Sequence, residues 1–302
     1  MPAPANAPSR LLSLGIPALF VVLWSSGFIA AKAGLQAADP LTFLALRFAL
    51  VTVLMLVIVL ATRPPWPRTW GEVGHIAIAG ALMQAVYFGG AWVSMSTGVG
   101  AGTAALIVCM QPIFTAIAAG PMLGERVGAR QWAGLGLGFL GVALVVERKL
   151  ELGLGTPMGI AICFVSLAGI TIGTLYQKRF CPTIDPRTGG LVQFTTATAM
   201  LLPCALLFEE ARIVWSIEFV AALFYVAVVL SLVSVSLLFV MIKRGEASRM
   251  TSLFFLVPPL TALMAWAALG ETMAWSAVAG MVLAVVGVAL VVTGRAPARK
   301  QQ

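Results

Sequence analysis

The chain has 302 residues, of which 60% are hydrophobic and 10% charged, and its 19 Lys and Arg against 11 Asp and Glu give a net charge of +8. Soluble domains carry about 25% charged residues, so this composition excludes a soluble globular protein and indicates a protein of membrane-spanning helices. On this background the basic excess favours cytoplasmic loops over nucleic-acid binding.

Ten apolar segments, each bounded by Pro, Gly or charged residues, predict ten membrane-spanning helices. They cover residues 11–33, 41–61, 72–95, 100–123, 132–147, 157–178, 189–208, 219–241, 251–269 and 273–293. We expect the first segment to be retained, because it is longer than the apolar core of a signal peptide. The predicted fold is therefore an all-α integral membrane protein with ten transmembrane helices.

A stretch of 47 residues, 100–146, recurs 146 residues later at 246–292, with 17 of the 47 positions identical. A composition this rich in Ala, Val, Leu and Gly would give roughly one identity in ten by chance. The matched positions include Pro112 with Pro258, Glu125 with Glu271 and, upstream, Lys32 with Lys178 and Asp39-Pro40 with Asp185-Pro186. The repeat predicts two homologous five-helix units, residues 1–148 and 155–302.

The Lys and Arg residues indicate how these units lie in the bilayer. With the N-terminus in the cytoplasm, fourteen of them fall on the cytoplasmic side and three on the opposite side. This bias predicts both termini inside. We expect the membrane to be a cytoplasmic (inner) membrane of the bacterial type. Because five is an odd number, the second unit is expected to be inverted relative to the first, as in many secondary transporters.

Several segments carry a family resemblance. LWSSGFIAAKAGL at 23–35, DPLTFLALRF at 39–48 and LGERVGARQWAGLGLGFLGVALVV at 123–146 are similar to the EamA family of the drug/metabolite transporter superfamily, and LGETMAWSAVAGMVLAVVGVALVV at 269–292 supplies the second copy. The resemblance covers essentially the whole chain. It implies ten helices in two inverted bundles around a central cavity, and transport of small organic metabolites, often the export of amino acids or related compounds.

Candidate substrate-binding residues lie where spans are interrupted near the middle of the bilayer. Pro112 and Pro258 each remove a backbone hydrogen bond and free a carbonyl, and Gln111 lies at the depth of Pro112. The alternatives are a packing kink for the prolines and an interhelical hydrogen bond for Gln111.

Polar side chains on other spans extend this set. Trp24, Ser25 and Ser26 lie at the centre of the first span, where they suit a small polar solute, although serines also bond back to their own helix. Polar stripes on three further spans predict faces turned away from lipid. Their members are Gln84 and Tyr87 on the third span, Thr171 and Thr174 on the sixth, and Ser231 and Ser234 on the eighth.

Two basic residues complete the candidates. Arg47 lies seven residues after Pro40, about 10 Å into its span. A buried arginine meets a substrate carboxylate, caps carbonyls at a helix break or extends outward to water. Lys32 and its repeat partner Lys178 lie near helix ends at opposite faces, where they reach water or attract anionic groups towards a cavity.

The sequence offers no support for catalysis or for a metal or cofactor site. The four cysteines are isolated, and the sequence has no catalytic triad, HExxH, Walker or dinucleotide-binding motif, so we expect neither an enzyme nor a metal or cofactor. All eleven carboxylates lie at span ends or in loops. Because ion-driven carriers usually place a titratable acid within the membrane, we expect a facilitator, or a carrier whose coupling uses no buried carboxylate.

The resulting hypothesis is a secondary transporter that exports amino acids or their derivatives by alternating access. Its expected partners are a small-molecule substrate and the lipid bilayer, without nucleic acid, and it functions as a monomer or homodimer. The alternatives are a multidrug-type exporter, a metabolite importer and, from another class, a non-transporting membrane scaffold.

Overall fold

A computed structural model describes residues 10–99, 101–150, 156–244, 247–269 and 275–293. Within them, the side chains of residues 10–14, 27–33, 35, 101–102, 105, 148–150, 239, 242–244, 247–249, 265 and 268–269 lie outside the description. The first half contains α1 (Arg10–Leu35), α2 (Pro40–Thr62), α3 (Trp70–Gly80), η1 (Ala81–Val86), α4 (Tyr87–Ser96), α5 (Ala101–Val108), α6 (Gln111–Leu123) and α7 (Ala129–Leu150).

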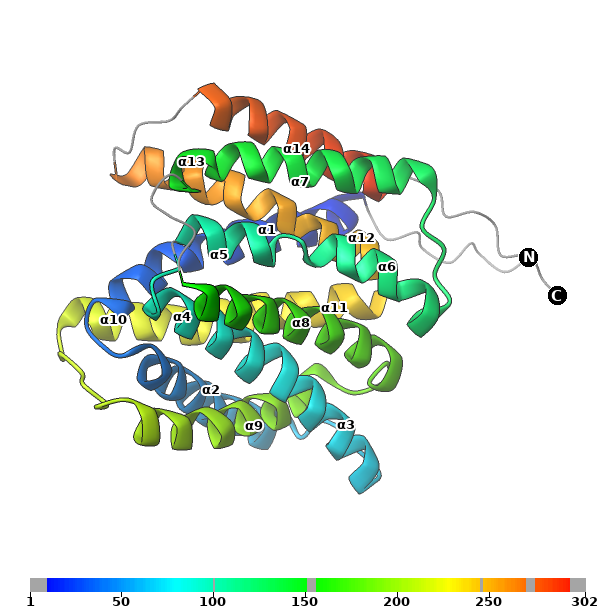
Figure 1. Cartoon of the computed structure of the whole chain (residues 1–302). Helices are drawn as coiled ribbons and strands as arrows, with labels where there is room; N and C mark the ends of the chain where they lie inside the picture. Colours follow the sequence, from blue (N-terminus) through cyan, green and yellow to red (C-terminus); the bar gives the residue numbers. More distant parts are fainter. Residues whose placement is uncertain (1–9, 100, 151–155, 245–246, 270–274, 294–302) are drawn as a thin grey trace, which may run out of the picture.

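The second half contains α8 (Pro157–Phe180), α9 (Pro186–Phe208), α10 (Ile217–Tyr225), η2 (Val226–Ser234), α11 (Val235–Arg244), α12 (Ala247–Ser252), η3 (Leu253–Leu256), α13 (Val257–Leu269) and α14 (Trp275–Thr293). Figure 1 shows these helices lying roughly alongside one another. Over the described ranges the fold is all-helical, apart from an isolated bridge between Ala38 and Ile213. The all-α prediction is therefore confirmed.

Eight segments of the described chain are long and apolar enough to cross a membrane. Two shorter apolar helices, Gly15–Ser26 and Met250–Met264, overlap the predicted first and ninth spans. Large apolar side chains such as Leu60, Leu206 and Phe208 are more than half exposed, as expected for surfaces that face lipid. The protein is thus a multi-pass membrane protein.

Local sequence explains where several of these helices begin. Thr69, Thr156 and Ser216 are N-cap residues whose hydroxyl oxygens accept backbone N–H groups of the first turn. The cap of α2 comes from the other half of the chain: the Glu209 carboxylate accepts the N–H groups of Leu41 and Thr42, each at 2.7 Å. A carboxylate at this position also interacts favourably with the helix dipole. Glu209 therefore connects the start of α2 to the end of α9.

The closest helix pairing joins α7 to α14, which lie side by side at the top of Figure 1. Rows of small residues allow this approach: a Cβ added to Gly134 would lie 2.6 Å from the Gly287 carbonyl oxygen, and one added to Gly141 would lie 2.5 Å from that of Gly280. These rows hold the fifth and tenth predicted spans to each other.

Helices α2 and α9 form a second contact between the halves, at the bottom of Figure 1. At this contact the hydroxyls of Thr52 and Thr198, which are 146 residues apart, lie 3.4 Å from each other. The spacing equals the offset of the sequence repeat. Corresponding segments of the two halves therefore meet at α2 and α9.

Four interruptions of regular helix occur at positions that correspond under this offset. The π-helical turns η1 and η2 lie within the third and eighth predicted spans. A break separates α5 from α6 just before Pro112, and the 3₁₀ turn η3 precedes Pro258. Proline at 258 deprives the Phe254 carbonyl of its usual helical donor, and the Cys109 thiol lies 3.9 Å from that oxygen. The freed carbonyl predicted at Pro258 thus has a partner from the break between α5 and α6.

Candidate functional site

Arg47 is buried in α2, with 2% of the residue exposed. Its Nε donates a hydrogen bond to the Ser231 hydroxyl at 2.9 Å. The guanidinium carbon lies 4.6 Å from the ring centroid of Phe88 and 5.2 Å from that of Phe48. None of the carboxylates in the described chain lies within ion-pair distance of it. The charge is therefore held by one hydroxyl and two aromatic rings.

The rings next to Arg47 continue into a cluster that we call the aromatic cluster, formed by Phe20, Trp24, Phe48, Phe88 and Phe254. Trp24 connects its two ends, with ring centroids 6.2 Å from Phe88 and 5.4 Å from Phe254. The latter pair has the edge-to-face geometry that aromatic quadrupoles favour. The cluster therefore extends from the charge on α2 across α1 to the helix break before Pro258.

The two serines of the first span, Ser25 and Ser26, directly follow Trp24 in α1. Ser25 donates to the Val21 carbonyl at 2.7 Å and lies 3.4 Å from the Val257 carbonyl, next to Pro258. Ser26 bonds to the Leu23 carbonyl and, at 2.7 Å, to the Tyr225 hydroxyl. Both serines bond back to their own helix, and each also contacts a span of the second half.

Both glutamines among the predicted residues, Gln84 and Gln111, are buried with an unsatisfied group. Gln111 donates from Nε2 to the Thr174 hydroxyl at 3.4 Å, next to the buried Pro112. Its Oε1 atom, and that of Gln84, are buried without a hydrogen-bond partner in the described structure. A buried unsatisfied amide oxygen costs about 1–3 kcal/mol. Such groups are retained where water or a ligand supplies the missing donor.

The hydroxyl groups of the remaining candidate residues differ in their hydrogen-bond partners. Thr171 and Thr174 donate to carbonyls four residues back in α8, whereas Ser231 and Ser234 donate to carbonyls five residues back in the π-helical η2. Tyr87 is buried at the start of α4. Lys32 lies in α1, and its side chain is outside the described residues.

Lys178, the repeat partner of Lys32, forms an ion pair with Glu125 at 3.1 Å. Both side chains are largely buried, with 21% and 14% exposed. The adjacent Arg179 donates to the Met122 carbonyl at 2.8 Å. The end of α8 is therefore attached to the turn between α6 and α7.

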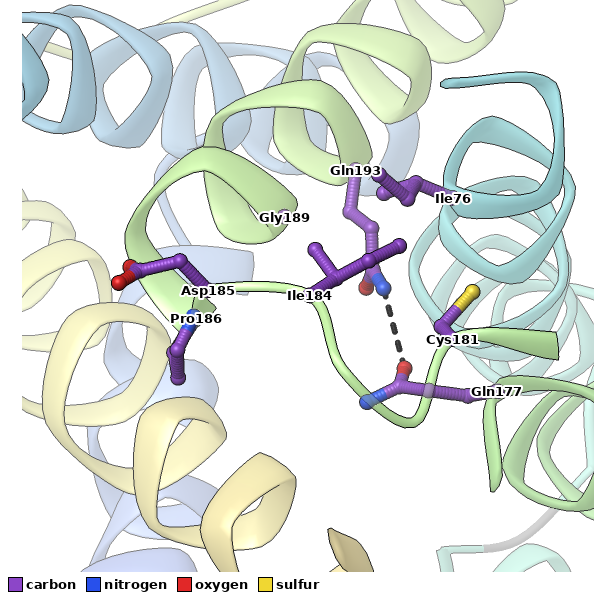
Figure 2. A pocket seen from close by; sticks show the side chains of 8 residues that line it. All are labelled: Ile76, Gln177, Cys181, Ile184, Asp185, Pro186, Gly189 and Gln193. Carbon is purple, nitrogen blue, oxygen red and sulfur yellow. Dashed lines mark hydrogen bonds between the residues drawn. The ribbon is translucent and has the colours of Figure 1, made fainter. Parts of the chain in front are cut away.

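A small pocket lies at the same end of α8, between Ile76 of α3 and the start of α9 (Figure 2). Gln193 points across it and donates from Nε2 to the Gln177 oxygen at 3.0 Å. Gln193 follows Arg47 by 146 residues and is therefore its repeat partner. The equivalent depth of the second half thus carries a neutral amide where the first half carries a charge.

Sequence reasoning did not identify Phe88, Phe254 or Tyr225, which surround the predicted polar residues. An aromatic residue in a continuously apolar span has no periodic contrast that would mark its direction. The π-helical turns were also missed, although the paired serines of η2 are two of the predicted residues. The only available signal was the repeat itself, which places both turns at matching positions.

Comparison with known proteins identifies the family that the chain resembles over both halves. The model of the EamA-like transporter family matches residues 13–147 and, a second time, residues 157–293. A solved crystal structure aligns with a TM-score of 0.78 at 19% identity, covering 93% of this chain and 96% of the other. That match shows a shared fold.

Curated relatives span nearly the same length. An "Uncharacterized transporter YvbV" of Bacillus subtilis is 28% identical over 277 residues, which cover 91% of this chain and 90% of that protein. A "Probable amino-acid metabolite efflux pump" of Salmonella typhimurium is 27% identical over 285 residues, covering 91% and 93%. An "Uncharacterized inner membrane transporter YedA" of Escherichia coli K12 is 23% identical, covering 89% and 88%.

Proposed function

The chain belongs to the EamA-like transporter family, and from this premise we propose that it is a secondary transporter or facilitator that exports amino acids or their derivatives. The observation that carries the proposal is the match of the family model to both halves. The efflux-pump name of the Salmonella relative supports the direction and the type of cargo. The buried Arg47, Gln84 and Gln111 supply polar groups for such a cargo.

We further propose the architecture of ten spans in two inverted units, residues 1–148 and 155–302, with both termini in the cytoplasm of a bacterial-type cell. The Thr52–Thr198 contact at the repeat offset and the π-helical turns at matching positions support this arrangement. Inverted units give two packings of similar energy, one open to each side. The working unit is a monomer or a homodimer in the lipid bilayer.

The proposed mechanism is rocking of the two units about the contacts α2–α9 and α7–α14. The candidate residues named above then line a cavity between the units, and Lys32 and Lys178 lie near its opposite mouths. Arg47 and Trp24 are 2% and 7% exposed, which corresponds to a state closed around them. Opening towards the side of Lys178 would separate α8 from the turn at Glu125.

Energy coupling follows from the placement of the acids. Each acidic residue in the described chain lies at a helix end or in a loop, so we propose transport without a carboxylate inside a membrane span as proton carrier. Purified protein in liposomes, assayed with and without a pH gradient, tests this proposal. Equal initial rates support it, whereas an obligatory proton gradient relayed by an acidic residue would refute it.

The transport function is tested by counterflow. Liposomes containing the purified protein are loaded with a mixture of unlabelled amino acids, and uptake of each labelled amino acid is followed. The proposal requires exchange of at least one compound above the level of protein-free liposomes. Exchange of none, with correctly folded protein, contradicts it.

The inverted topology has a separate test. Single cysteines introduced at positions 125 and 271, in a background without the four native cysteines, are treated with a membrane-impermeant thiol reagent in intact cells. Labelling at position 271 alone supports the two inverted units. Labelling of both positions from one side excludes them.

A further inference from the structure

The charge of Arg47 has no counter-ion in the described structure. A guanidinium carries five N–H donors, and only Nε has an acceptor, the Ser231 hydroxyl. Among the described side chains, ion pairs join Lys178 to Glu125 and Arg187 to Asp185, both at helix ends. A buried charge without a partner is strongly destabilising, so its retention indicates a use.

The contacts of Arg47 leave its two Nη atoms without a hydrogen-bond acceptor in the described structure. Phe88 and Phe48 lie close to the guanidinium carbon and stabilise the cation, but aromatic rings do not replace strong hydrogen-bond acceptors. Ser231 holds the Nε atom, and the Ser231 hydroxyl donates in turn to the Val226 carbonyl inside η2. The two Nη atoms remain, and a pair of guanidinium N–H groups matches the two oxygens of a carboxylate.

The aromatic cluster extends from Arg47 in one direction, towards the helix break before Pro258. From Phe88 the rings continue through Trp24 to Phe254, where the helix is interrupted before Pro258. A molecule whose anionic group meets Arg47 would have its apolar part against these rings. Such a wall suits flat or aliphatic substituents.

The second half does not repeat the charge. Its equivalent of Arg47 is Gln193, whose amide bonds to Gln177. The pair therefore provides one positive charge and one neutral amide at matching depths, which suits a single anionic group.

We propose that Arg47 binds the carboxylate of the transported molecule, and that the aromatic cluster binds its apolar part. This inference rests on the proposed transport function and names the substrate class within it: organic acids, including zwitterionic amino acids, with one carboxylate and an apolar or aromatic substituent. Arg47 is thus the residue that distinguishes an acid from its amide.

The test uses liposomes that contain the purified full-length protein and are loaded with three matched pairs. These are L-phenylalanine with L-phenylalaninamide, L-leucine with L-leucinamide, and 3-phenylpropionate with 3-phenylpropionamide. Release of all six is measured together, relative to protein-free liposomes. We expect at least one acid to be released at least about tenfold faster than its amide, because a site built to pair a buried polar group rejects the analogue that cannot pair with it.

The possible outcomes distinguish a failure of the role proposed for Arg47 from a failure of the proposed transport function. Release of amides at the same rate as the acids, or of amides alone, overturns the role of Arg47 and leaves the protein a transporter. If none of the six is released while other amino acids exchange in counterflow, the substrate class is wrong. Absence of both activities overturns the proposed function itself.

Substitution of Arg47 then tests whether this residue causes the preference for acid over amide. Arg47→Gln is expected to abolish the preference for acid over amide, and Arg47→Lys to keep part of it, because lysine retains the charge without the planar fork. Arg187→Gln is the matched control: Arg187 is 40% exposed, pairs with Asp185 and is expected to leave the preference unchanged. An Arg47→Gln protein that keeps the full preference refutes the inference, and if that variant does not fold, the wild-type acid and amide rates still decide it.

Discussion

The pairing of α7 with α14 makes a sharp prediction about Gly141. A Cβ at this position would lie 2.5 Å from the Ala284 nitrogen and 2.5 Å from the Gly280 oxygen, about 0.9 Å inside the 3.4 Å at which ordinary contact begins. Both atoms belong to backbone within a helix and cannot rotate away. Gly141→Ala must therefore push the two helices apart, and overpacking of this kind costs about 1–3 kcal/mol.

The same helix provides a matched control. A Cβ at Gly136 meets nothing within 4 Å, so Gly136→Ala introduces the same methyl group without a clash. Alanine is also the better helix former by about 1 kcal/mol, so this variant is expected to unfold at the same temperature as wild type or higher.

Thermal unfolding of the purified protein in detergent, followed by loss of helical circular dichroism, compares the two variants. We expect Gly141→Ala to unfold at a lower temperature than wild type and than Gly136→Ala. Indistinguishable midpoints for the two alanine variants would show that α7 and α14 are not packed as the structure has them. Gly280→Ala provides a replicate from the other helix, since its Cβ would lie 2.5 Å from the Gly141 oxygen.

Three further predictions use the same assays. Glu209→Gln keeps the size of the α2 cap but removes its charge and replaces one of its two accepting oxygens by an NH2 group, so it should cost at least about 1 kcal/mol of stability, whereas an unchanged midpoint would mean that the cap contributes nothing. Ser231→Ala removes the acceptor of Arg47 Nε, so we expect lower stability and a weaker preference for acids over amides in the liposome assay; retention of both would separate Ser231 from the site. Lys178→Met should cost more than the roughly 1 kcal/mol typical of an exposed pair, because it removes Lys178 from the largely buried Glu125 carboxylate, and it should alter the transport rate if this contact closes one mouth. The charge-reversed pair Lys178→Glu with Glu125→Lys should then restore that rate, and failure to do so would argue against a role for the ion pair.

Several features of the site followed from local sequence. The burial of Arg47 was predicted from its distance past Pro40, and the breaks before Pro112 and Pro258 from the chemistry of proline. Ser25 and Ser26 were expected either to face a solute or to bond to their own helix, and the structure contains the second kind of bond for both. These properties depend on a residue's identity and its position along one helix, so they can be predicted without knowing its neighbours.

Other features depended on partners from distant parts of the chain. The contact between Arg47 and Ser231 spans 184 residues, and nothing in either helix specifies the other. The glycine rows of α7 and α14 illustrate the same limit: small residues predict close packing but are compatible with many partner helices.

The sequence alone determined that this chain is a helical membrane protein with an internal duplication, because apolarity and repetition are properties of consecutive residues. It also determined the family, through motifs that both halves carry. Tertiary structure decided which helices meet, where the π-helical turns lie, and that aromatic rings and one serine, not an acid, surround Arg47. These choices arise from the fit of whole helix surfaces to one another, and surface fit exists only once the helices are packed together.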